Sequence, residues 1–253
     1  MHMTITDDFS ALGLSEQMLA AVRAKGFETP TAIQKLTIPH LLTKPNDIIA
    51  QSQTGTGKTA AYGLPILQTL EPARGPIQAI ILVPTRELAL QAAEELLSYN
   101  REKRLSITAI YGGAAMSEQL RRLAKGIDIV VGTPGRVLDH IRRGTMKLEN
   151  VRYLVLDEAD EMLNMGFQDS ITEILEGVPE ERNTLLFGYY DDSKSLERLK
   201  SLTSSDSYYS SCYSWVGRIC NPVLNQVGVA EGDDSKKAAL VAEAKALRAF
   251  AHF

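Results

Sequence analysis

The segment Gly55-Thr-Gly-Lys-Thr59 combines glycines, a lysine and a threonine in an order that suits binding of nucleotide phosphates. Glycines let backbone N–H groups close around phosphate oxygens, and the N-terminus of a following helix adds positive potential. In this arrangement Lys58 would reach the β- and γ-phosphates, and the Thr59 hydroxyl would bind Mg²⁺. The strict pattern has glycine where this chain has Ser52, so the match is incomplete at that position.

A group of carboxylates, Asp157-Glu-Ala-Asp160, follows the apolar run Val151–Leu156. At the end of a strand, Asp157 could hold magnesium beside a phosphate loop. Glu158 could then orient or deprotonate an attacking water. Taken alone, these residues would also fit an acidic helix N-terminus, where the helix dipole favours carboxylates. Together with the phosphate loop, they predict binding of a nucleoside triphosphate with Mg²⁺.

Short apolar runs alternate with segments of helical periodicity along the chain. This alternation predicts a doubly wound parallel α/β sheet, in which ligands bind at the carboxyl ends of the strands. The near-continuous apolar character of the runs suits strands that are covered on both faces. The predicted strands are Asp47–Gln51, Ile77–Val83, Ser106–Tyr111, Ile127–Val131, Tyr153–Leu156 and Asn183–Phe187. The predicted helices are Lys58–Leu70, Arg86–Tyr99, Ser117–Ala124, Gly135–Arg142 and Gln168–Gly177, with Thr133 and Pro134 as N-cap and first residue of the fourth.

Composition excludes several classes of function. The net charge of −4 provides no overall basic field for nucleic acid or anionic lipid, so any such contact must be local. Apolar runs such as Ala79–Val83 are too short to cross a bilayer, and the N-terminus lacks the apolar core of a secretory signal. The two cysteines and four histidines form no metal-ligand pattern. We therefore expect a cytoplasmic protein with no membrane association.

Six segments between about Phe9 and Phe187 form an ordered series of motifs: Gly26–Gln34, Ser52–Thr59, Pro84–Gln91, Gly112-Gly113, Thr133–Arg136 and Asp157–Asp160. With these motifs the chain resembles the N-terminal RecA-like domain of DEAD-box ATP-dependent RNA helicases, in which they are called, in the same order, Q, I, Ia, GG, Ib and II. The resemblance implies a RecA-like P-loop NTPase domain, with Lys58, Asp157 and Glu158 as the catalytic residues and Thr59 and Asp157 on the metal.

The resemblance also implies how ATP is bound. Gln34 would hydrogen-bond the adenine edge and so select ATP over GTP, while Phe27 would stack on the base with support from Phe9. The alternative for Gln34 is an ordinary amide on a helix surface. The implied nucleotide-binding residues are Phe9, Phe27, Gln34, Ser52, Thr54, Gly55, Thr56, Gly57, Lys58 and Thr59.

The implied RNA contacts lie at junctions between strands and helices, where backbone N–H groups and arginines can meet phosphates. Such binding is nearly independent of sequence and weakens with salt. For Arg86 and Arg136 the alternative is a solvated surface charge. Asp160 would couple hydrolysis to RNA unwinding. The implied RNA-binding residues are Pro84, Thr85, Arg86, Gly113, Thr133, Gly135 and Arg136.

The resemblance fails after Phe187, where the family has Ser-Ala-Thr and this chain has Gly188-Tyr-Tyr-Asp191. A shift of reading frame explains the change, because TCG-GCT-ACT-ATG read two bases later gives GGC-TAC-TAT-G, which encodes Gly-Tyr-Tyr. The alternative is a genuinely divergent tail, and the DNA around codon 188 decides between them. We accordingly divide the chain into a RecA-like domain, residues 1–190, and an atypical tail, residues 191–253, with a helix predicted over Ser235–Phe253.

The family hydrolyses ATP between two RecA-like domains, and the second supplies an arginine finger. No His-Arg-x-Gly-Arg-like motif follows Asp160. Three hypotheses remain: the ATP-binding domain of a truncated helicase, a non-catalytic lobe that binds nucleotide or RNA and modulates another helicase, or a lobe whose second domain is supplied by a separate chain. In each, activity requires a second RecA-like domain in cis or in trans.

Overall fold

The computed structural model describes residues 8–43, 47–51, 55–73, 75–101 and 103–188. The chain divides into two units, Met1–Tyr189 and Tyr190–Phe253, and all of the described residues belong to the first. Ser52, Thr54 and the tail, with its predicted helix, lie outside the described residues.

The described residues form a six-stranded sheet in the order β1-β6-β5-β2-β4-β3, and every pair of neighbouring strands is parallel. Because sequential strands are separated by helices, the connections cross over and the carboxyl ends of all strands lie at one edge. The predicted class, a doubly wound parallel α/β fold, is confirmed. The strands are β1 (Ile48–Gln51), β2 (Ala79–Leu82), β3 (Ile107–Ile110), β4 (Ile129–Gly132), β5 (Tyr153–Asp157) and β6 (Asn183–Gly188).

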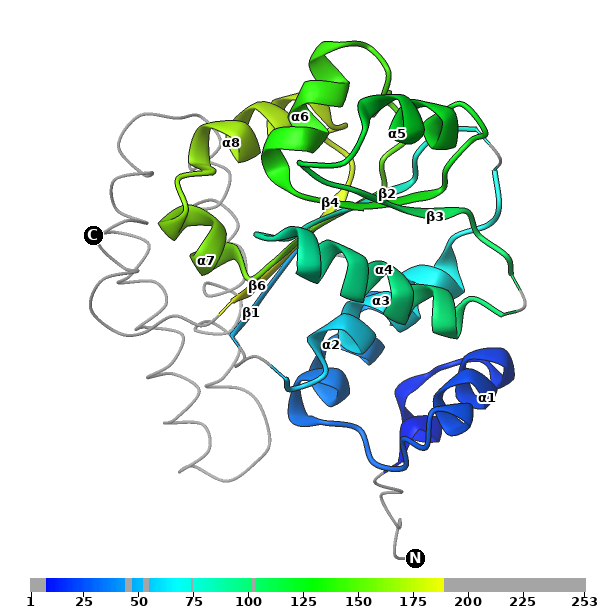
Figure 1. Cartoon of the computed structure of the whole chain (residues 1–253). Helices are drawn as coiled ribbons and strands as arrows, with labels where there is room; N and C mark the ends of the chain where they lie inside the picture. The colour runs from blue at the N-terminus through cyan, green and yellow to red at the C-terminus, as the bar shows by residue number, and fades with distance from the viewer. Residues whose placement is uncertain (1–7, 44–46, 52–54, 74, 102, 189–253) are drawn as a thin grey trace, which may run out of the picture. The chain divides into compact units, whose positions relative to one another are not determined.

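Helices cover both faces of the sheet (Figure 1). α1 to α4 lie on one face, and α5, α6 and α8 lie on the other. The helices are the 3₁₀ helix η1 (Phe9–Leu12), α1 (Glu16–Ala24), α2 (Ala32–Thr43), α3 (Lys58–Thr69), α4 (Arg86–Tyr99), α5 (Met116–Leu123), α6 (Pro134–Arg142), α7 (Ala159–Asn164) and α8 (Gln168–Gly177). Among these elements, no helix has both the length and the apolar character needed to span a lipid bilayer.

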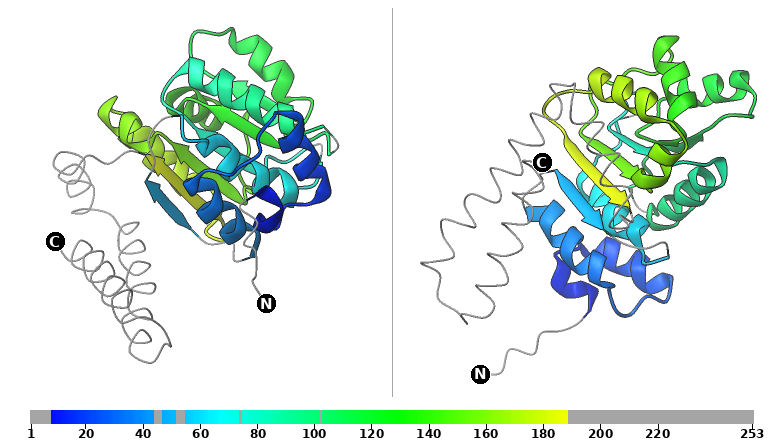
Figure 2. Two further views of the ribbon diagram at one scale, coloured as in Figure 1. Left: turned by 90° about the horizontal axis from the view of Figure 1, so that it is seen from below. Right: turned by 90° about the vertical axis from the view of Figure 1, so that its left-hand side faces the viewer.

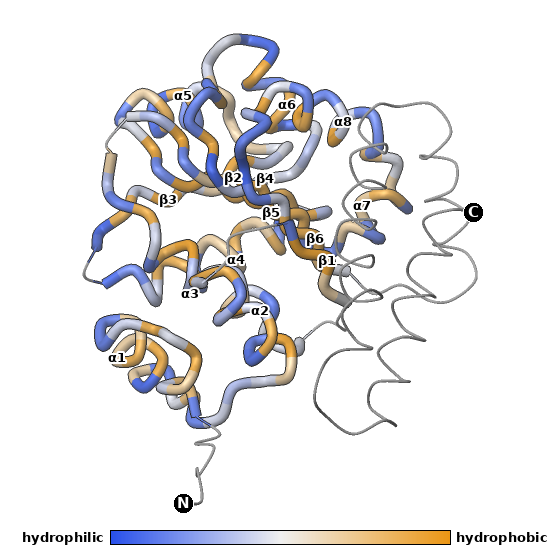
Figure 3. The backbone as a smooth tube through the Cα atoms, turned by 180° about the vertical axis from the view of Figure 1, so that it is seen from behind, coloured by the Kyte–Doolittle hydropathy of each residue, from blue (hydrophilic) through white to orange (hydrophobic). Residues whose placement is uncertain are grey.

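The central strand β2 contributes to two hydrophobic cores. Ala79 and Ile81 pack on the side of α1 to α4, whereas Ile80 and Leu82 pack on the opposite side. All four side chains are fully shielded from solvent. Figure 3, in which each residue is coloured by its hydropathy, shows apolar residues along the central strands. An uninterrupted apolar run is therefore the pattern expected of a strand buried on both faces.

The structure corrects several boundaries and adds helices that the sequence pattern did not predict. β5 extends one residue further, so that Asp157 lies within the strand, whereas α6 begins at Pro134, the residue predicted to be its first. Thr133 is the N-cap as predicted, but its side chain makes no capping hydrogen bond. The helices α1, α2 and α7 were not predicted. α2 contains Pro39 and buries both polar and apolar residues, which conceals its periodicity, and α7 has only six residues.

Candidate nucleotide and nucleic-acid sites

Three neighbouring strands bring the two principal motifs to one edge of the sheet. β6 lies next to β1 in the sheet (Figure 2), between β1 and β5. The register aligns Gln51 with Gly188 and Phe187 with Asp157. The loop after β1 and the carboxylates after β5 therefore flank the end of β6. α3 begins directly after the loop, with Gly57 as its N-cap.

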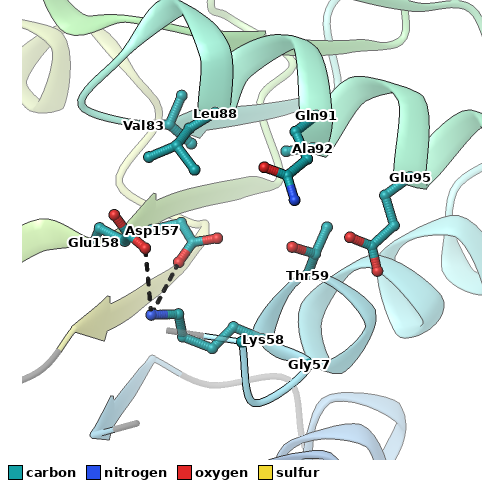
Figure 4. A pocket seen from close by; sticks show the side chains of 11 residues that line it. Gly57, Lys58, Thr59, Val83, Leu88, Gln91, Ala92, Glu95, Asp157 and Glu158 are labelled. Atoms are coloured by element: carbon teal, nitrogen blue, oxygen red, sulfur yellow. Dashed lines mark ion pairs between the residues drawn. The ribbon is translucent and has the colours of Figure 1, made fainter. Parts of the chain in front are cut away.

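A cavity of about 510 Å³ lies at this edge. Figure 4 shows the side chains of Lys58, Thr59, Asp157 and Glu158 around it, together with Gln91 and Glu95 from α4. Neither Gln91 nor Glu95 was predicted to belong to the nucleotide site. Their spacing of four residues places both on one face of α4, which was the available signal. The cavity is lined by Gly55, Gly57, Lys58, Thr59, Val83, Leu88, Gln91, Ala92, Glu95, Asp157 and Glu158.

Lys58 is a buried cation, with 6% of its surface exposed. Its Nζ lies 3.9 Å from Asp157 Oδ1 and 3.9 Å from Glu158 Oε1. One ammonium group thus faces two carboxylates at ion-pair distance rather than at hydrogen-bond distance. A buried cation is stable only with such partners.

Asp157 has one satisfied oxygen and one that is not. Oδ2 accepts a hydrogen bond of 3.0 Å from the Tyr62 hydroxyl, whereas the buried Oδ1 has no hydrogen-bond partner. Burial raises the pKa of Asp157 to about 6, because the loss of hydration outweighs the lowering effects of Lys58 and Tyr62. A buried carboxylate oxygen without a partner costs free energy, and a cation or its bound water would satisfy it.

The shifted pKa predicts that D157N stabilises the protein free of nucleotide and metal. The folded pKa of about 6 exceeds the unfolded value of 3.8, so the ionised carboxylate costs stability above pH 6. That cost falls as the pH is lowered from 6 towards 4. Two pKa units correspond to about 3 kcal/mol, so D157N should raise the free energy of unfolding by about 1–3 kcal/mol at pH 8.

Urea unfolding with EDTA at pH 8 and at pH 5 measures this effect, which should be smaller at pH 5. Asp169→Asn removes the same charge from an exposed position and should change stability by less than about 0.5 kcal/mol at either pH. Destabilisation by D157N at pH 8 would show instead that attraction to Lys58 exceeds the cost of burial.

Glu158 has left-handed backbone angles, with φ 58° and ψ 48°. A non-glycine residue in this region carries strain of roughly 1–3 kcal/mol, and such strain concentrates at functional sites. The conformation separates the end of β5 from the start of α7. It allows Asp157 to remain in the strand while the next side chain also approaches Lys58.

Gln34 links the Q motif to the phosphate loop. Its Oε1 accepts a hydrogen bond of 2.9 Å from the Thr31 N–H, and its Nε2 donates one of 3.1 Å to the Gly57 carbonyl. Gly57 has φ 83°, and a Cβ atom there would lie 2.4 Å from Gln34 Nε2, so only glycine permits this contact. The amide retains one N–H and one lone pair for a base. Phe27 is 44% exposed and Phe9 is buried.

The other motif residues follow β2, β3 and β4 at the same edge. Gly113 and Gly135 are exposed, and Gly113 has φ 81°. The side chain of Thr85 caps α4 by accepting a hydrogen bond from the Leu88 N–H. Pro84 is buried, and the guanidinium of Arg86 lies 5.0 Å from the Tyr111 ring centroid.

Arg136 is turned partly inward, which its motif did not predict. Its guanidinium nitrogen Nη1 donates to the Ala114 carbonyl at 3.2 Å and to Gln119 Oε1 at 3.3 Å. Gln119 also contacts the fully buried His140. A phosphate contact by Arg136 would use the remaining guanidinium N–H groups. The hydrogen bond to Ala114 links motif Ib to the residue that follows the GG motif.

The domain model described as DEAD/DEAH box helicase matches residues 31–188. The chain belongs to the DEAD/DEAH box helicase family. The ATP-dependent RNA helicase CshA of Listeria monocytogenes is 54% identical over 179 residues, covering 71% of this chain and 34% of that protein. The DEAD-box ATP-dependent RNA helicase CshA of Bacillus subtilis is 52% identical over 185 residues, covering 73% and 37%. The predicted family is thus confirmed.

Solved DEAD-box structures share the fold. A DEAD box protein from the hyperthermophile Methanococcus jannaschii has a TM-score of 0.72 and 46% identity, covering 78% of this chain and 53% of that chain. S. cerevisiae Dbp5 bound to RNA and ADP BeF3 has a TM-score of 0.69 and 34% identity, covering 78% and 50%. The chain spans about a third of the length of the curated relatives and about half that of the solved chains.

Proposed function

We propose that residues 1–190 are the ATP-binding lobe of a DEAD-box RNA helicase and that residues 191–253 are an atypical tail. The observation that carries the proposal is the cavity in which Lys58 lies at ion-pair distance from Asp157 and Glu158. Oδ1 of Asp157 is buried there without a hydrogen-bond partner. The phosphates would lie against the phosphate loop, where Lys58 would turn from the carboxylates to the β- and γ-phosphates. The proposal includes a cytoplasmic location.

Mg²⁺ fits this site through Thr59 and Asp157. Oδ1 of Asp157 accepts no hydrogen bond, and this supports a cation that would balance its negative charge. Among the described residues, no group of three or more His, Cys, Asp or Glu side chains could hold a metal by itself. Mg²⁺ does not require such a group, because it commonly binds one or two protein groups together with phosphates and water. The bound ion would neutralise charge on the phosphates.

Glu158 would orient or deprotonate the attacking water, and Asp160 would couple hydrolysis to RNA. Asp160 lies beside Gly188, where an added Cβ atom would be 2.7 Å from Asp160 Oδ1. Glycine offers no hydroxyl at the position where the family has serine. This contact supports the second candidate function, in which the lobe binds nucleotide or RNA without efficient turnover.

RNA would bind along the ends of β2, β4 and β3 through Pro84, Thr85, Arg86, Gly113, Thr133, Gly135 and Arg136. Exposed glycines and helix N-termini offer backbone N–H groups to phosphates. The structural neighbour Dbp5, which was solved bound to RNA and ADP BeF3, supports RNA as the ligand. Binding should be independent of RNA sequence and should weaken with salt. Hydrolysis would require a second RecA-like domain, in cis or in trans.

The role of Gln34 provides the test of nucleotide identity. Gln34→Ala should reduce the preference for ATP over GTP by about 5- to 150-fold, since a bidentate contact to a base contributes about 1–3 kcal/mol of discrimination. Competition by ATP and by GTP against a fluorescent ATP analogue measures the ratio of affinities. A general disturbance of the loop around Gly57 would weaken the binding of both nucleotides equally, so that the ratio of their affinities would not change.

Leu36→Ala is the matched control, because Leu36 lies on the same helix and is 74% exposed. It should leave both affinities within about twofold. The proposal would be contradicted if the unaltered chain bound no nucleotide. An unchanged ATP/GTP ratio in Gln34→Ala would contradict the adenine contact alone.

A further inference from the structure

Tyr62 is a fully buried tyrosine beside the proposed magnesium site, and neither of the two principal motifs contains it. It lies on α3, three residues after Thr59, so both side chains are on the same face of the helix. Its ring contacts Phe187 of β6, with ring centroids 5.4 Å apart. The ring therefore packs from α3 onto β6, the strand between β1 and β5.

The Tyr62 hydroxyl lies next to Asp157, one of the two residues that would bind Mg²⁺. It donates its hydrogen to Asp157 Oδ2 at 3.0 Å. Thr59, the other residue, lies one turn earlier on the same helix. Burial and the nearby Asp157 hold the pKa of Tyr62 well above its usual value, which keeps this hydrogen in place.

The hydrogen bond from Tyr62 determines which oxygen of Asp157 remains for a cation. Because Oδ2 is occupied, the oxygen left without a hydrogen-bond partner is Oδ1, which lies 3.9 Å from Lys58 Nζ. Thr59 and Asp157 both line the same cavity (Figure 4).

We propose that Tyr62 is a positioning residue for Mg²⁺: its hydroxyl fixes the orientation of the Asp157 carboxylate so that Oδ1 is presented to the cation or its bound water. The inference rests on the proposed nucleotide site. Mutation of a group that orients a metal ligand commonly lowers metal affinity about 10- to 100-fold. A purely structural tyrosine would instead affect stability and all nucleotide binding alike.

The test compares Y62F with the unaltered 253-residue chain, since phenylalanine keeps the ring contact with Phe187 and removes only the hydroxyl. Fluorescent ADP is titrated in EDTA and again over a range of Mg²⁺ concentrations. We expect the apparent affinity for Mg²⁺ of the ADP-bound chain to fall about 10- to 100-fold. Affinity for ADP in EDTA should change by less than about twofold.

Tyr99→Phe is the matched control. Tyr99 is also buried and donates to a carboxylate, Glu95, at 3.2 Å, but it has no contact with Thr59 or Asp157. It should leave the Mg²⁺ dependence unchanged. Equal losses for Y62F with and without Mg²⁺, or no loss at all, would overturn the inference. If the unaltered chain bound no ADP, the proposed function would fail instead.

A second measurement needs no variant. In the unaltered chain labelled with ¹³C at tyrosine Cζ, addition of Mg²⁺ to the ADP-bound protein should shift the Tyr62 resonance, because the carboxylate that accepts its hydrogen bond becomes a metal ligand. The Tyr99 resonance should not move. A Tyr62 resonance that is insensitive to Mg²⁺ would overturn the inference even if Y62F did not fold.

Discussion

The 253-residue chain is expected to hydrolyse ATP far more slowly than ~1 s⁻¹, with or without RNA. The proposed site provides a phosphate loop, a magnesium carboxylate and Glu158, but after Asp160 the sequence has no motif for an arginine finger. An arginine finger contributes about 10³–10⁵ in rate to related phosphoryl transfers. Phosphate release from ATP, measured with and without single-stranded RNA, gives the turnover.

Joining a second RecA-like domain of the DEAD-box family after residue 187 should then raise RNA-stimulated hydrolysis by about 10³-fold or more. The same domain added as a separate chain should give a smaller, concentration-dependent increase. Glu158→Gln in the joined protein is the control and should remove the gain. Turnover near ~1 s⁻¹ by the chain alone would contradict the expectation. Continued inactivity of the joined protein would favour the non-catalytic lobe.

Lys58→Ala is expected to weaken nucleotide binding by about 30- to 3000-fold. The substitution removes the cation proposed to meet the phosphates, and it leaves Asp157 and Glu158 facing one another without a charge between them. Removing one partner of a buried charge pair typically costs about 2–5 kcal/mol, and each 1.4 kcal/mol is a factor of ten in affinity. Titration of fluorescent ATP with Mg²⁺ measures the loss.

Lys125→Ala provides the comparison for Lys58→Ala, because Lys125 is exposed in the turn after α5. It should leave the affinity within about twofold. Thermal unfolding of both variants in the absence of nucleotide separates loss of binding from loss of fold. A Lys58→Ala protein that remained folded and bound ATP normally would refute the assignment of the phosphate site.

The sequence pattern predicted the sheet well because its physical basis is local. The central strands β2, β4 and β5 are short apolar runs buried on both faces, and the motifs lie at the strand ends, which a parallel sheet brings to one edge. The helix α2 was missed for an equally physical reason. α2 buries Gln34 and Thr37 among apolar residues, so its packing against α3 replaces the polar and apolar alternation of a surface helix.

Other features depend on contacts between distant residues and have no signal in the sequence. Tyr62 and Asp157 are 95 residues apart in the sequence. They meet because the sheet places β1, which precedes α3, two strands from β5, with β6 between them. The inward turn of Arg136 likewise depends on Gln119, from another helix. The family model ends at residue 188, next to the place where the frame-shift hypothesis begins. That hypothesis still requires the DNA sequence.

The strand order has a consequence for how the lobe acquires its fold during synthesis. Within the described sheet β1 has a single neighbour, β6, which is the last of the six strands to leave the ribosome. At about 5–20 residues per second, the strand preceding the phosphate loop waits several seconds for its partner. A nascent chain halted before Asn183 would leave β1 unpaired, with an edge open to chaperones or to other chains. Once Gly188 has emerged, every strand has its neighbour, whatever sequence follows.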